Sequence, residues 1–545
     1  MPRVKNFFDL LHWKNCENEV LFIWGGNFAL RSVKKLVALL LGGTFLWGCT
    51  AAFAVLPAGA DSAAAGSQAV QATVVGRPAP QPLVSRPPAD QIQTLAPGVC
   101  YYPISGRTWQ DEPLKGHVLE VDPGQALLEV RVAVGGDALG RKETLSRLAA
   151  RHGAVAAVNG GYFDPSSGHP IGSLVQDGRL LATSGILRTS VGITGDNRVR
   201  FGYFAPRVTV RPGDGEPLVA AGVNTSPVAG GITLYTPAWG ERAGSAGDGI
   251  DVVVRPETEK SSRYIVSEIG YGGSPIPRDG YVLTFRGEAA AQAAVLAVGT
   301  PVDVQFDWGA GWEGLKHLVT AGPLLVDEGQ PLLQAIMEGF RGSVLEPAPR
   351  TAIGVDGQGR LLLVEVDGRL KEWSAGVTLE ELAYLMADLG AVRAAALDGG
   401  GSSAMWVKGR LVSRPSGGRE RELANAILVL HQVPVYLNGE RLFFDVPPLM
   451  DNGRTLVPMR RIFEVLGAEV SWNEETRTVT ATRGERTVSL ALGQKEAVVN
   501  GKTLPLDAPA RAVEGRTMVP LRFVGEALGA AVTWQDNPLA VIIEQ

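Results

Sequence analysis

The sequence predicts a strand-rich fold of the α+β or α/β class, with a pseudo-duplicated core that contains few helices and a small α+β C-terminal domain of two tandem repeats. Three observations lead to this prediction. Glycine accounts for 68 of the 545 residues without a collagen-like period, which is typical of short strands joined by tight turns. Alternating apolar runs recur between residues 98 and 432. The chain after residue 433 repeats itself at a constant spacing.

The composition bounds the size and class of the protein. At about 150 residues per domain the length predicts about three domains, and a hydrophobic content of 45% is enough to bury real cores. Lys and Arg number 51 against 56 Asp and Glu, which gives a formal net charge of -5, and the body of the chain has no basic run. Such a charge distribution provides no positively charged surface for a nucleic-acid duplex. We therefore expect no nucleic-acid partner.

Residues 1–60 have the features of an N-terminal extension followed by a secretory signal. Basic residues up to Lys35 precede an uncharged stretch from Leu36 to Ala60, which is the order of charge and apolar character found in exported proteins. Three kinds of processing are consistent with it: cleavage after Ala60, lipidation of Cys49, or retention as a membrane anchor. The bulky Trp47 beside Cys49 disfavours lipidation. We expect a secreted or cell-surface protein.

A Pro- and Ala-rich stretch, residues 61–97, separates this leader from the globular part. Its composition does not bury enough apolar surface to order itself, so it is predicted to be a disordered linker. Cysteine occurs only at positions 16, 49 and 100, so a processed chain has no internal disulfide. A cysteine-based zinc site is excluded for the same reason. The sequence indicates neither a cofactor nor a metal.

Residues 98–432 form the longest predicted domain. Strands are indicated by alternating runs such as HVLEV, RVRFGYF and RLLLVEV. The best specified helix runs from Thr378 to Leu389, where Thr378 and Glu381 form a capping box and Gly390 provides the C-terminal stop. Leucines and Met386 supply its apolar stripe.

Residues 433–545 form the second predicted domain, built from two copies of one unit. Asn438-Gly439 recurs as Asn500-Gly501, and VPMRRIFEVLGAEVSW recurs as VPLRFVGEALGAAVTW, both at an offset of 62. Each unit is expected to contain an Asn-Gly hairpin, a short helix and a closing strand around a tryptophan. The repeat resembles the N-terminal domain of copper amine oxidases, which implies a stalk. No His or Cys occurs from Val433 onward, so copper binding is not expected.

The core domain contains a second, weaker symmetry. A helical stretch, the buried run GAVAAV and the loop Asn159-Gly160-Gly161 match a helix, the run GAVRAAAL and the loop Asp398-Gly399-Gly400-Gly401. Downstream, SLVQDGRLL matches SAMWVKGRLV. The strings RTSVG at Arg188 and RTAIG at Arg350 also match, although their order differs between the halves. We infer a pseudo-duplicated core in which two related loops lie at strand ends.

These loops suggest an anion site beside a carboxylate. Glycines let the backbone approach a ligand, and their free amides suit a phosphate or sulfate. Arg188 and Arg350 add charge-assisted bidentate bonds to the same oxygens. Asp398 and Asp164 are then the carboxylates placed to act on a sugar carbon. A tight turn is the competing explanation for each Asx-Gly-Gly string.

Six strings in order resemble the phosphodiester glycosidase family. They are NGGYFD at Asn159, YTPAWG at Tyr235, IPRDGYVL at Ile276, TAGPLLV at Thr320, RTAIGVD at Arg350 and LDGGGSSAM at Leu397. The resemblance covers residues 98–432 and implies cleavage between a sugar anomeric carbon and a phosphodiester.

The candidate site residues follow from the motifs and this resemblance together. The catalytic candidates are Asp398, Asp164 and Glu268. The substrate- or phosphate-binding candidates are Arg350, Arg188, Asn159, Gly160, Gly161, Tyr162, Thr320, Gly322, Gly399, Gly400, Gly401, Ser402 and Ser403. Asn425 either lines the site or caps a strand.

The expected substrate is a phosphate-linked glycan or another sugar-1-phosphodiester of an envelope or extracellular polymer, and the C-terminal domain is a candidate for binding cell-wall polymer. Two other classes of function compete with a hydrolase. One is a carbohydrate- or anion-binding protein without chemistry, and the other is a structural envelope protein. A charged residue at each presumed strand end favours the enzyme, because a pure scaffold does not need them.

Overall fold

The computed structural model describes residues 81–545 except 245, 246, 248, 259, 260, 262, 333, 452, 453, 514, 537 and 538. All described residues belong to one compact unit within Ala72–Gln545. The predicted leader, its Cys49 and residues 61–80 of the predicted linker lie outside the described residues. Within the described part, no helix combines the length and apolar character needed to cross a bilayer.

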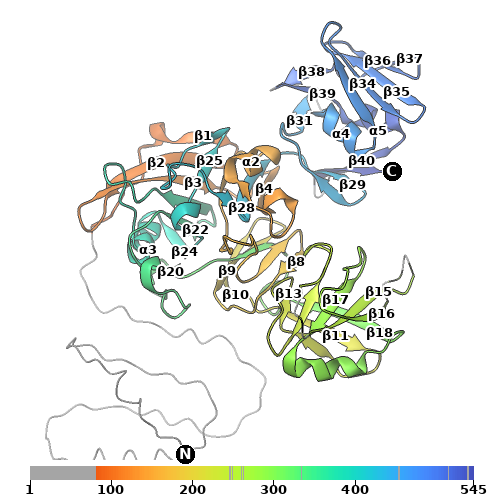
Figure 1. Ribbon diagram of the computed structural model, residues 1–545. Coiled ribbons are helices and arrows are strands. Elements are labelled where there is room, and N and C mark those ends of the chain that lie inside the picture. The colour runs from red at the N-terminus through yellow and green to blue at the C-terminus, as the bar shows by residue number, and fades with distance from the viewer. Residues whose placement is uncertain are drawn as a thin grey trace, which may run out of the picture. The chain divides into compact units, whose positions relative to one another are not determined.

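Three antiparallel sheets enclose the main core (Figure 1). The first has the order β1 (Gln93–Ala96), β2 (Val99–Arg107), β3 (Pro113–Val121), β23 (Leu361–Val366), β22 (Arg350–Asp356), β24 (Ala391–Ala396), β20 (Leu324–Asp327) and β21 (Gln330–Pro331). The second has the order β26 (Arg410–Leu411), β25 (Met405–Val407), β6 (Ala156–Asn159), β28 (Asn425–His431) and β4 (Leu128–Val134). The third has the order β10 (Val199–Tyr203), β9 (Thr189–Thr194), β19 (Leu315–Thr320), β7 (Leu174–Gln176) and β8 (Arg179–Ala182).

Every pairing in these three sheets is antiparallel, so the fold is α+β and the α/β alternative does not apply. Antiparallel strands need no crossover helices, which explains why helices are few. Apolar side chains from all three sheets meet in one core, represented by Leu119, Val158, Val191, Ile353 and Ile427. Several of these strands are buried on both faces, and the sequences of β23 and β28 are accordingly mostly apolar.

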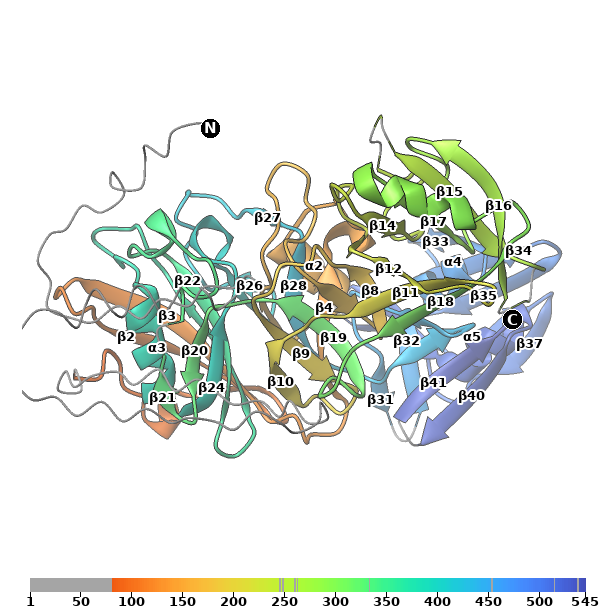
Figure 2. The ribbon, with the colours of Figure 1, turned by 90° about the horizontal axis from the view of Figure 1, so that it is seen from below.

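Two helices cover the outer faces of the first two sheets. Helix α3 (Leu379–Asp388) packs on β24, β20 and β22 (Figure 2), and α2 (Leu145–Arg151) packs on β6 and β25. The predicted capping box at Thr378 and Glu381 is confirmed in full. A two-stranded sheet of β5 (Glu143–Thr144) and β27 (Glu422–Leu423) adjoins α2. Short 3-10 turns occur at Ala89–Gln91, Gly135–Asp137, Gly287–Val295, Gly342–Val344 and Gly400–Ser402.

The predicted pseudo-duplication has a structural counterpart. In one half α2 leads into β6 and the Asn159 loop, and in the other α3 leads into β24 and the Asp398 loop. The matched strings downstream form the hairpins β7–β8 and β25–β26. The two halves thus repeat an order of helix, buried strand, polar loop and hairpin.

An eight-stranded sheet is inserted between β10 and β19. Its order is β12 (Leu218–Ala220), β11 (Arg207–Pro212), β18 (Pro301–Asp307), β16 (Tyr264–Tyr271), β15 (Ile250–Pro256), β17 (Tyr281–Phe285), β14 (Ile232–Tyr235) and β13 (Gly222–Val223). Its core continues into the third sheet through side chains such as Val175 and Leu318.

The C-terminal domain contains two successive series of short strands, each with one helix. The first unit contains β29 (Val435–Leu437), β30 (Glu440–Leu442), β31 (Leu449–Asp451), β32 (Arg454–Pro458), α4 (Met459–Val465), β33 (Glu469–Asn473), β34 (Thr478–Arg483) and β35 (Arg486–Ala491). The second contains β36 (Glu496–Val499), β37 (Lys502–Pro505), β38 (Arg511–Val513), β39 (Arg516–Pro520), α5 (Leu521–Leu528), β40 (Ala531–Asp536) and β41 (Leu539–Glu544). Both Asn-Gly pairs have positive φ angles in tight hairpins, as two-residue turns of this type require.

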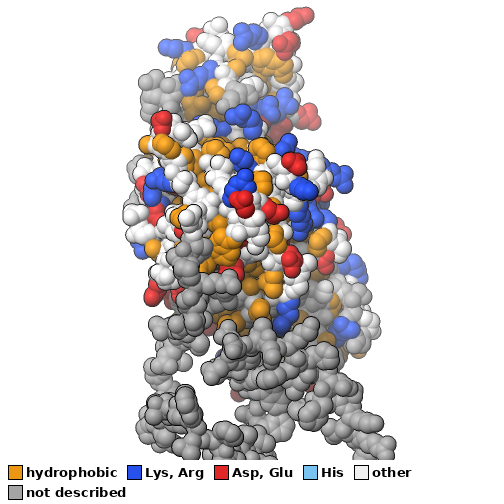
Figure 3. Space-filling model, turned by 90° about the vertical axis from the view of Figure 1, so that its left-hand side faces the viewer, with side chains coloured by type: hydrophobic (Ala, Val, Ile, Leu, Met, Phe, Trp, Pro, Cys, Tyr) orange, Lys and Arg blue, Asp and Glu red, His pale blue; other side chains and the backbone are white. Residues whose placement is uncertain are grey.

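The globular part begins earlier than predicted. Leu83 and Val84 are buried, and β1 pairs with β2, so the segment from Leu83 packs on the first sheet although its composition predicted a linker up to residue 97. A few apolar side chains that pack against a sheet edge are enough to order this segment, although its average composition is typical of a linker. On the face drawn in Figure 3, acidic and basic side chains are interspersed with exposed apolar ones.

The capping box generates a stability prediction. Glu381 is fully buried, and its carboxylate accepts hydrogen bonds from Thr378 N at 2.9 Å and from Trp109 N at 2.8 Å. We expect Glu381→Ala to lower the free energy of unfolding by about 2–4 kcal/mol, because it removes the cap and leaves buried donors unpaired. Denaturant unfolding measures this loss. The neighbouring Glu380→Ala serves as a control and should change stability by less than about 0.5 kcal/mol; equal losses would contradict the assignment.

Candidate active site

Five strand ends from the three sheets meet at one place in the core domain. Strand β6 ends at Asn159, β19 ends at Thr320, and β24 runs into Asp398, whereas β9 and β22 begin at Thr189 and Arg350. The sequence therefore placed most of its candidates correctly at strand ends. Which of them face a ligand depends on their hydrogen bonds.

Asn159 is a buried connector. Its Oδ1 accepts hydrogen bonds from Thr351 Oγ1 at 2.6 Å and from Ala404 N at 3.1 Å, and its Nδ2 donates to the Asp398 carbonyl at 2.7 Å. The side chain is only 1% exposed. Because its amide is occupied in this way, Asn159 positions the Asp398 loop, and the predicted direct contact with phosphate is corrected to a supporting role.

The amides of Gly160 and Gly161 are also occupied. Gly160 N donates to the Asn425 carbonyl at 3.1 Å, and Gly161 N donates to Asn425 Oδ1 at 2.7 Å. A Cβ atom on Gly160 would lie 2.1 Å from Asn425 Oδ1, and one on Gly161 would lie 2.4 Å from the Thr320 carbonyl. These glycines therefore permit close packing. The predicted anion nest at this loop is wrong, because its donors are used inside the protein.

The triple-glycine loop that follows Asp398 differs from the Asn159 loop, because guanidinium groups surround it. A Cβ atom on Gly399 would lie 3.6 Å from Arg350. One on Gly400 would lie 3.4 Å from Arg369, and one on Gly401 would lie 2.8 Å from Arg421. Three positive charges thus lie against three successive glycines. The Gly399 amide donates a hydrogen bond to Asp398 Oδ1, and the Gly400 amide donates one to the Pro349 carbonyl.

The two serines that follow complete this loop. Ser402 Oγ accepts a hydrogen bond from Arg421 at 3.3 Å. The buried Ser403 Oγ makes no hydrogen bond within the described residues. The exposed guanidinium groups of Arg369 and Arg421 make this loop the better candidate for an anion.

Asp398 lies at the base of this loop, mostly shielded from solvent. Burial raises the pKa of its carboxyl to about 6, although hydrogen bonds from Ser402 and Gly399 and the charge of Arg421 act in the opposite direction. A carboxyl that titrates near neutral pH beside a set of arginines is suited to acid–base or nucleophilic work.

Arg350 is used differently from the prediction. It is buried, and its Nε and Nη2 donate to the carbonyls of Val377, Val344 and Glu346 at 3.0, 2.8 and 2.6 Å. The guanidinium nitrogens that were expected to bind phosphate thus donate mainly to backbone carbonyls. Only Nη1 faces Gly399. Burial lowers the pKa of Arg350 to about 10. Arg369 and Arg421, which the sequence analysis did not select, are exposed and better placed to bind an anion.

Arg188 and Tyr162 form one wall. The Arg188 guanidinium lies 4.3 Å from the Phe340 ring centroid and 5.6 Å from that of Tyr162, and its Nε donates to the Glu338 carbonyl. The Tyr162 hydroxyl donates to the Gly322 carbonyl at 2.8 Å. The nearby charges of Asp398, Arg350 and Arg188 all act on the Tyr162 hydroxyl, whose pKa is raised mainly by burial. Tyr162 therefore belongs to the same cluster as Asp398.

Glu338 is a residue that sequence reasoning missed. It is 4% exposed, and its carboxylate accepts hydrogen bonds from Thr189 N, Thr189 Oγ1 and Leu324 N, each at 2.8 Å. A Cβ on Gly322 would lie 2.4 Å from Glu338 Oε2, so this glycine leaves room for the carboxylate. The buried Thr320 hydroxyl likewise accepts from Ser173 N. Neither role has a local sequence signal, because the partners are far apart in the chain.

The two other catalytic candidates are exposed. Asp164 is exposed, and its carboxylate accepts hydrogen bonds from Ser166 and Ser167 in a local turn. These bonds lower its pKa. Glu268 is exposed on β16 of the inserted sheet, opposite Val253. Within the described residues neither forms a hydrogen bond or ion pair with Asp398, so the geometry favours Asp398 as the acting carboxylate.

Comparison with known proteins gives two family matches. Residues 252–430 match the family described as phosphodiester glycosidase, and residues 436–543 match the copper amine oxidase N-terminal domain. The first match includes Arg350 and Asp398.

Among curated relatives, the N-acetylglucosamine-1-phosphodiester alpha-N-acetylglucosaminidase of Mus musculus is 24% identical over 286 residues, which is 52% of this chain and 37% of that protein. The Bos taurus enzyme of the same name is 34% identical over 106 residues, 19% of this chain and 20% of that one. A hypothetical protein from Synechocystis has a crystal structure that is similar with a TM-score of 0.56 and 26% identity over 64% of each chain. The chain spans only 12% to 37% of the length of the curated relatives it matches.

The raised pKa of Asp398 generates a prediction about stability. Because the folded state binds this proton more tightly than the unfolded chain does, the resulting stabilisation is complete below pH 4 and is lost as the pH rises through about 6. Asp398→Asn carries no charge, so we expect it to be more stable than wild type at pH 8 by up to about 3 kcal/mol, and equal to it at pH 4. Thermal unfolding at both pH values measures the difference. The exposed Asp164→Asn should show no such gain, and a gain of the same size there would refute the interpretation.

Proposed function

We propose that this chain, which carries a phosphodiester glycosidase domain followed by a copper amine oxidase N-terminal domain, hydrolyses the bond between the anomeric carbon of a sugar and a phosphodiester. The observation that carries the proposal is the pairing of Asp398 with the arginine-lined triple-glycine loop. A carboxyl of tuned pKa and a site for an anion are the two components that this reaction needs.

In the proposed reaction the phosphodiester lies against Arg369 and Arg421. The bond between the anomeric carbon and the phosphate oxygen breaks with its electron pair on the oxygen, and water supplies the new oxygen to the sugar. Phosphate is a good leaving group, so little help from a general acid is required. Ionised Asp398 stabilises or attacks the developing oxocarbenium centre.

We further propose an envelope or extracellular glycopolymer as the substrate. The support is the charge-then-apolar order of residues 31–60, which predicts export to the surface where such polymers occur. The names of the mammalian relatives point to a sugar-1-phosphodiester in general terms.

The test is release of reducing sugar from a panel of sugar-1-phosphodiesters. We expect turnover by wild type and a decrease in kcat of at least about a hundredfold in Asp398→Asn with KM nearly unchanged, because the charge acts mainly in the transition state. Turnover should rise with pH through about 6 as Asp398 ionises. Asp164→Asn should retain near wild-type activity. Glycan binding without sugar release from any substrate would replace the enzyme with a carbohydrate- or anion-binding protein.

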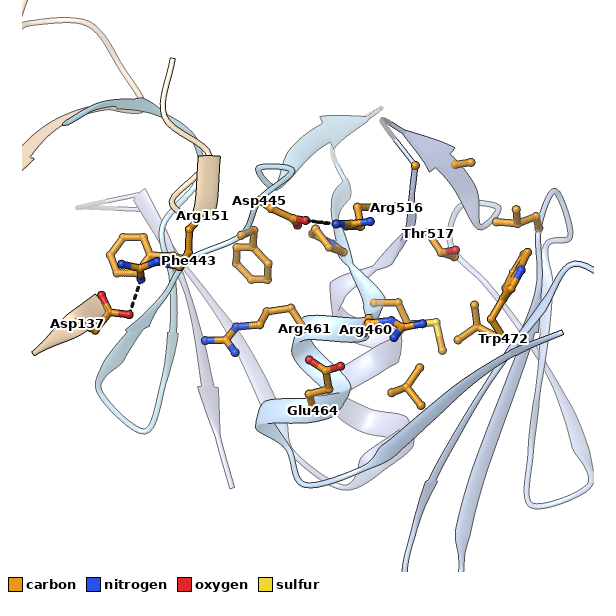
Figure 4. A pocket seen from close by; sticks show the side chains of 18 residues that line it. Asp137, Arg151, Phe443, Asp445, Arg460, Arg461, Glu464, Trp472, Arg516 and Thr517 are labelled. Atoms are coloured by element: carbon orange, nitrogen blue, oxygen red, sulfur yellow. Dashed lines mark hydrogen bonds and ion pairs between the residues drawn. The ribbon is translucent and has the colours of Figure 1, made fainter. Parts of the chain in front are cut away.

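We propose that the C-terminal domain binds an anionic cell-wall polymer. A cavity of about 910 Å³ is lined by Arg460, Arg461 and Trp472 (Figure 4). Arg516, which also lines it, pairs with Asp445 at 2.6 Å. Guanidinium groups beside an aromatic ring suit a chain of phosphates and sugars.

We expect the double variant Arg460→Ser/Arg461→Ser to bind teichoic-acid-type polymer at least about tenfold more weakly, because two charge-assisted contacts are lost, with turnover of a small soluble substrate unchanged. Co-sedimentation with purified cell wall measures binding. Lys495→Ser/Lys502→Ser, at two exposed positions outside the cavity, is the matched control for the loss of two charges. Equal binding by all three proteins would reject the proposal.

A further inference from the structure

A buried cluster of His117, Glu365 and Asp367 lies within the first sheet, outside the site described above. His117 on β3 stands directly opposite Glu365 on β23, and Asp367 follows the end of β23. One potential ligand atom from each side chain lies within 4.8 Å of the other two. The three residues are 9%, 1% and 1% exposed, so solvent does little to stabilise their polar atoms.

Two polar atoms of this cluster lack hydrogen-bond partners among the described residues: His117 Nε2 and Glu365 Oε2. The other atoms are held in place. His117 Nδ1 is 2.9 Å from the Tyr101 hydroxyl. The Asp367 carboxylate accepts hydrogen bonds from Trp373 Nε1 at 2.7 Å and from Arg414 N at 2.6 Å. An imidazole nitrogen and a carboxylate oxygen are thus fixed, buried and unsatisfied beside a second carboxylate.

Such an arrangement is costly without a cation. Buried polar atoms are nearly always paired, because an unpaired one loses its hydrogen bonds to water without replacement. In the part of the chain that the structure describes, no Lys or Arg forms a salt bridge with Glu365 or Asp367. A positive charge between the three side chains would satisfy all of them together.

We propose that His117, Glu365 and Asp367 bind a divalent transition-metal ion, with Zn²⁺ as the ion of choice. One imidazole and two carboxylates are ligands that Zn²⁺ accepts, whereas Ca²⁺ prefers six to eight oxygens. The Tyr101 hydroxyl can accept from Nδ1–H, which leaves the Nε2 lone pair free to ligate, as a metal-bound histidine requires.

Two buried carboxyl groups as close together as those of Glu365 and Asp367 can also share a proton. Burial together with Asp367 raises the pKa of Glu365 well above its ordinary value. In the absence of a metal, a proton shared by the two carboxyls is therefore the competing occupant, and metal binding would displace it.

The site would fix a loop that reaches the Asp398 region. The Asp367 carbonyl accepts from Ser374 Oγ at 2.6 Å, and Arg369 N donates to the Ala375 carbonyl at 2.9 Å. These bonds close the loop that presents Arg369 to Gly400. The metal would thus have a structural role between strands β3 and β23 and this loop. The proposal does not depend on the proposed hydrolase activity.

The test is Zn²⁺ binding by the full chain after treatment with a chelator and removal of the chelator. We expect one Zn²⁺ per chain by elemental analysis after desalting, a Tm several degrees higher than that of the metal-free protein, and no comparable rise with Ca²⁺. Co²⁺ should give a visible absorption band from a site with one nitrogen and several oxygen ligands. Absence of stoichiometric Zn²⁺ binding by folded protein would overturn the proposal.

Glu365→Gln separates the metal from the shared proton. Glutamine imitates the protonated acid, so a site that holds only a proton would tolerate it and leave the metal content of the chain unchanged. If the site holds Zn²⁺, the variant should fold but bind Zn²⁺ at least about a hundredfold more weakly and lose the Tm rise. Asp177→Asn, in the separate cluster of Glu129, Asp177 and His317, should keep the full stoichiometry. Zn²⁺ retained in Glu365→Gln, or lost in Asp177→Asn, would reject the assignment.

Discussion

The buried side-chain amide of Asn159 is the interaction on which the arrangement of the core depends. It receives hydrogen bonds from Thr351 and Ala404 and donates one to the Asp398 carbonyl. Thr351 lies on β22 of the first sheet, Ala404 directly precedes β25 of the second, and Asp398 begins the triple-glycine loop. Since the amide provides both acceptor and donors, Asp, which as a carboxylate has no donor, could not make the same three bonds. The geometry of Asp398 is thus set by a residue that need not touch the substrate.

The arginines around the triple-glycine loop divide into two kinds. Arg350 is buried and serves the backbone through three carbonyls, whereas Arg369 and Arg421 are exposed above Gly400 and Gly401. A buried guanidinium that remains charged contributes a fixed field without moving, and the exposed pair can adjust to the ligand. The absence of three side chains from the loop allows each guanidinium group to lie against the backbone of one glycine. This explains a run of glycines better than a turn requirement alone, because only Gly400 among them has a positive φ.

Local signals in the sequence predicted local structure well. The capping box of α3, the Asn-Gly hairpins and the repeat at offset 62 depend on residues within a few positions of each other, and all are present. The hydrogen-bond partners of each polar group could not be predicted, because they lie far away along the chain. Asn425 occupies the amides of the Asn159 loop from 264 residues away, and Glu338 reaches Thr189 across 149 residues. His117 and Glu365 become neighbours only through the pairing of β3 with β23.

The insertion of a complete sheet between two adjacent strands has a consequence for how the protein folds. Ser190 on β9 stands opposite Thr320 on β19, although the inserted sheet separates them along the chain. Closing so long a flexible segment carries a large entropic cost, which falls once the segment has become compact with its ends close together. The inserted sheet is therefore expected to form before β9 and β19 pair. The strand ends at Thr189 and Thr320, which adjoin the Asp398 site, would then be among the last regions of the domain to assemble.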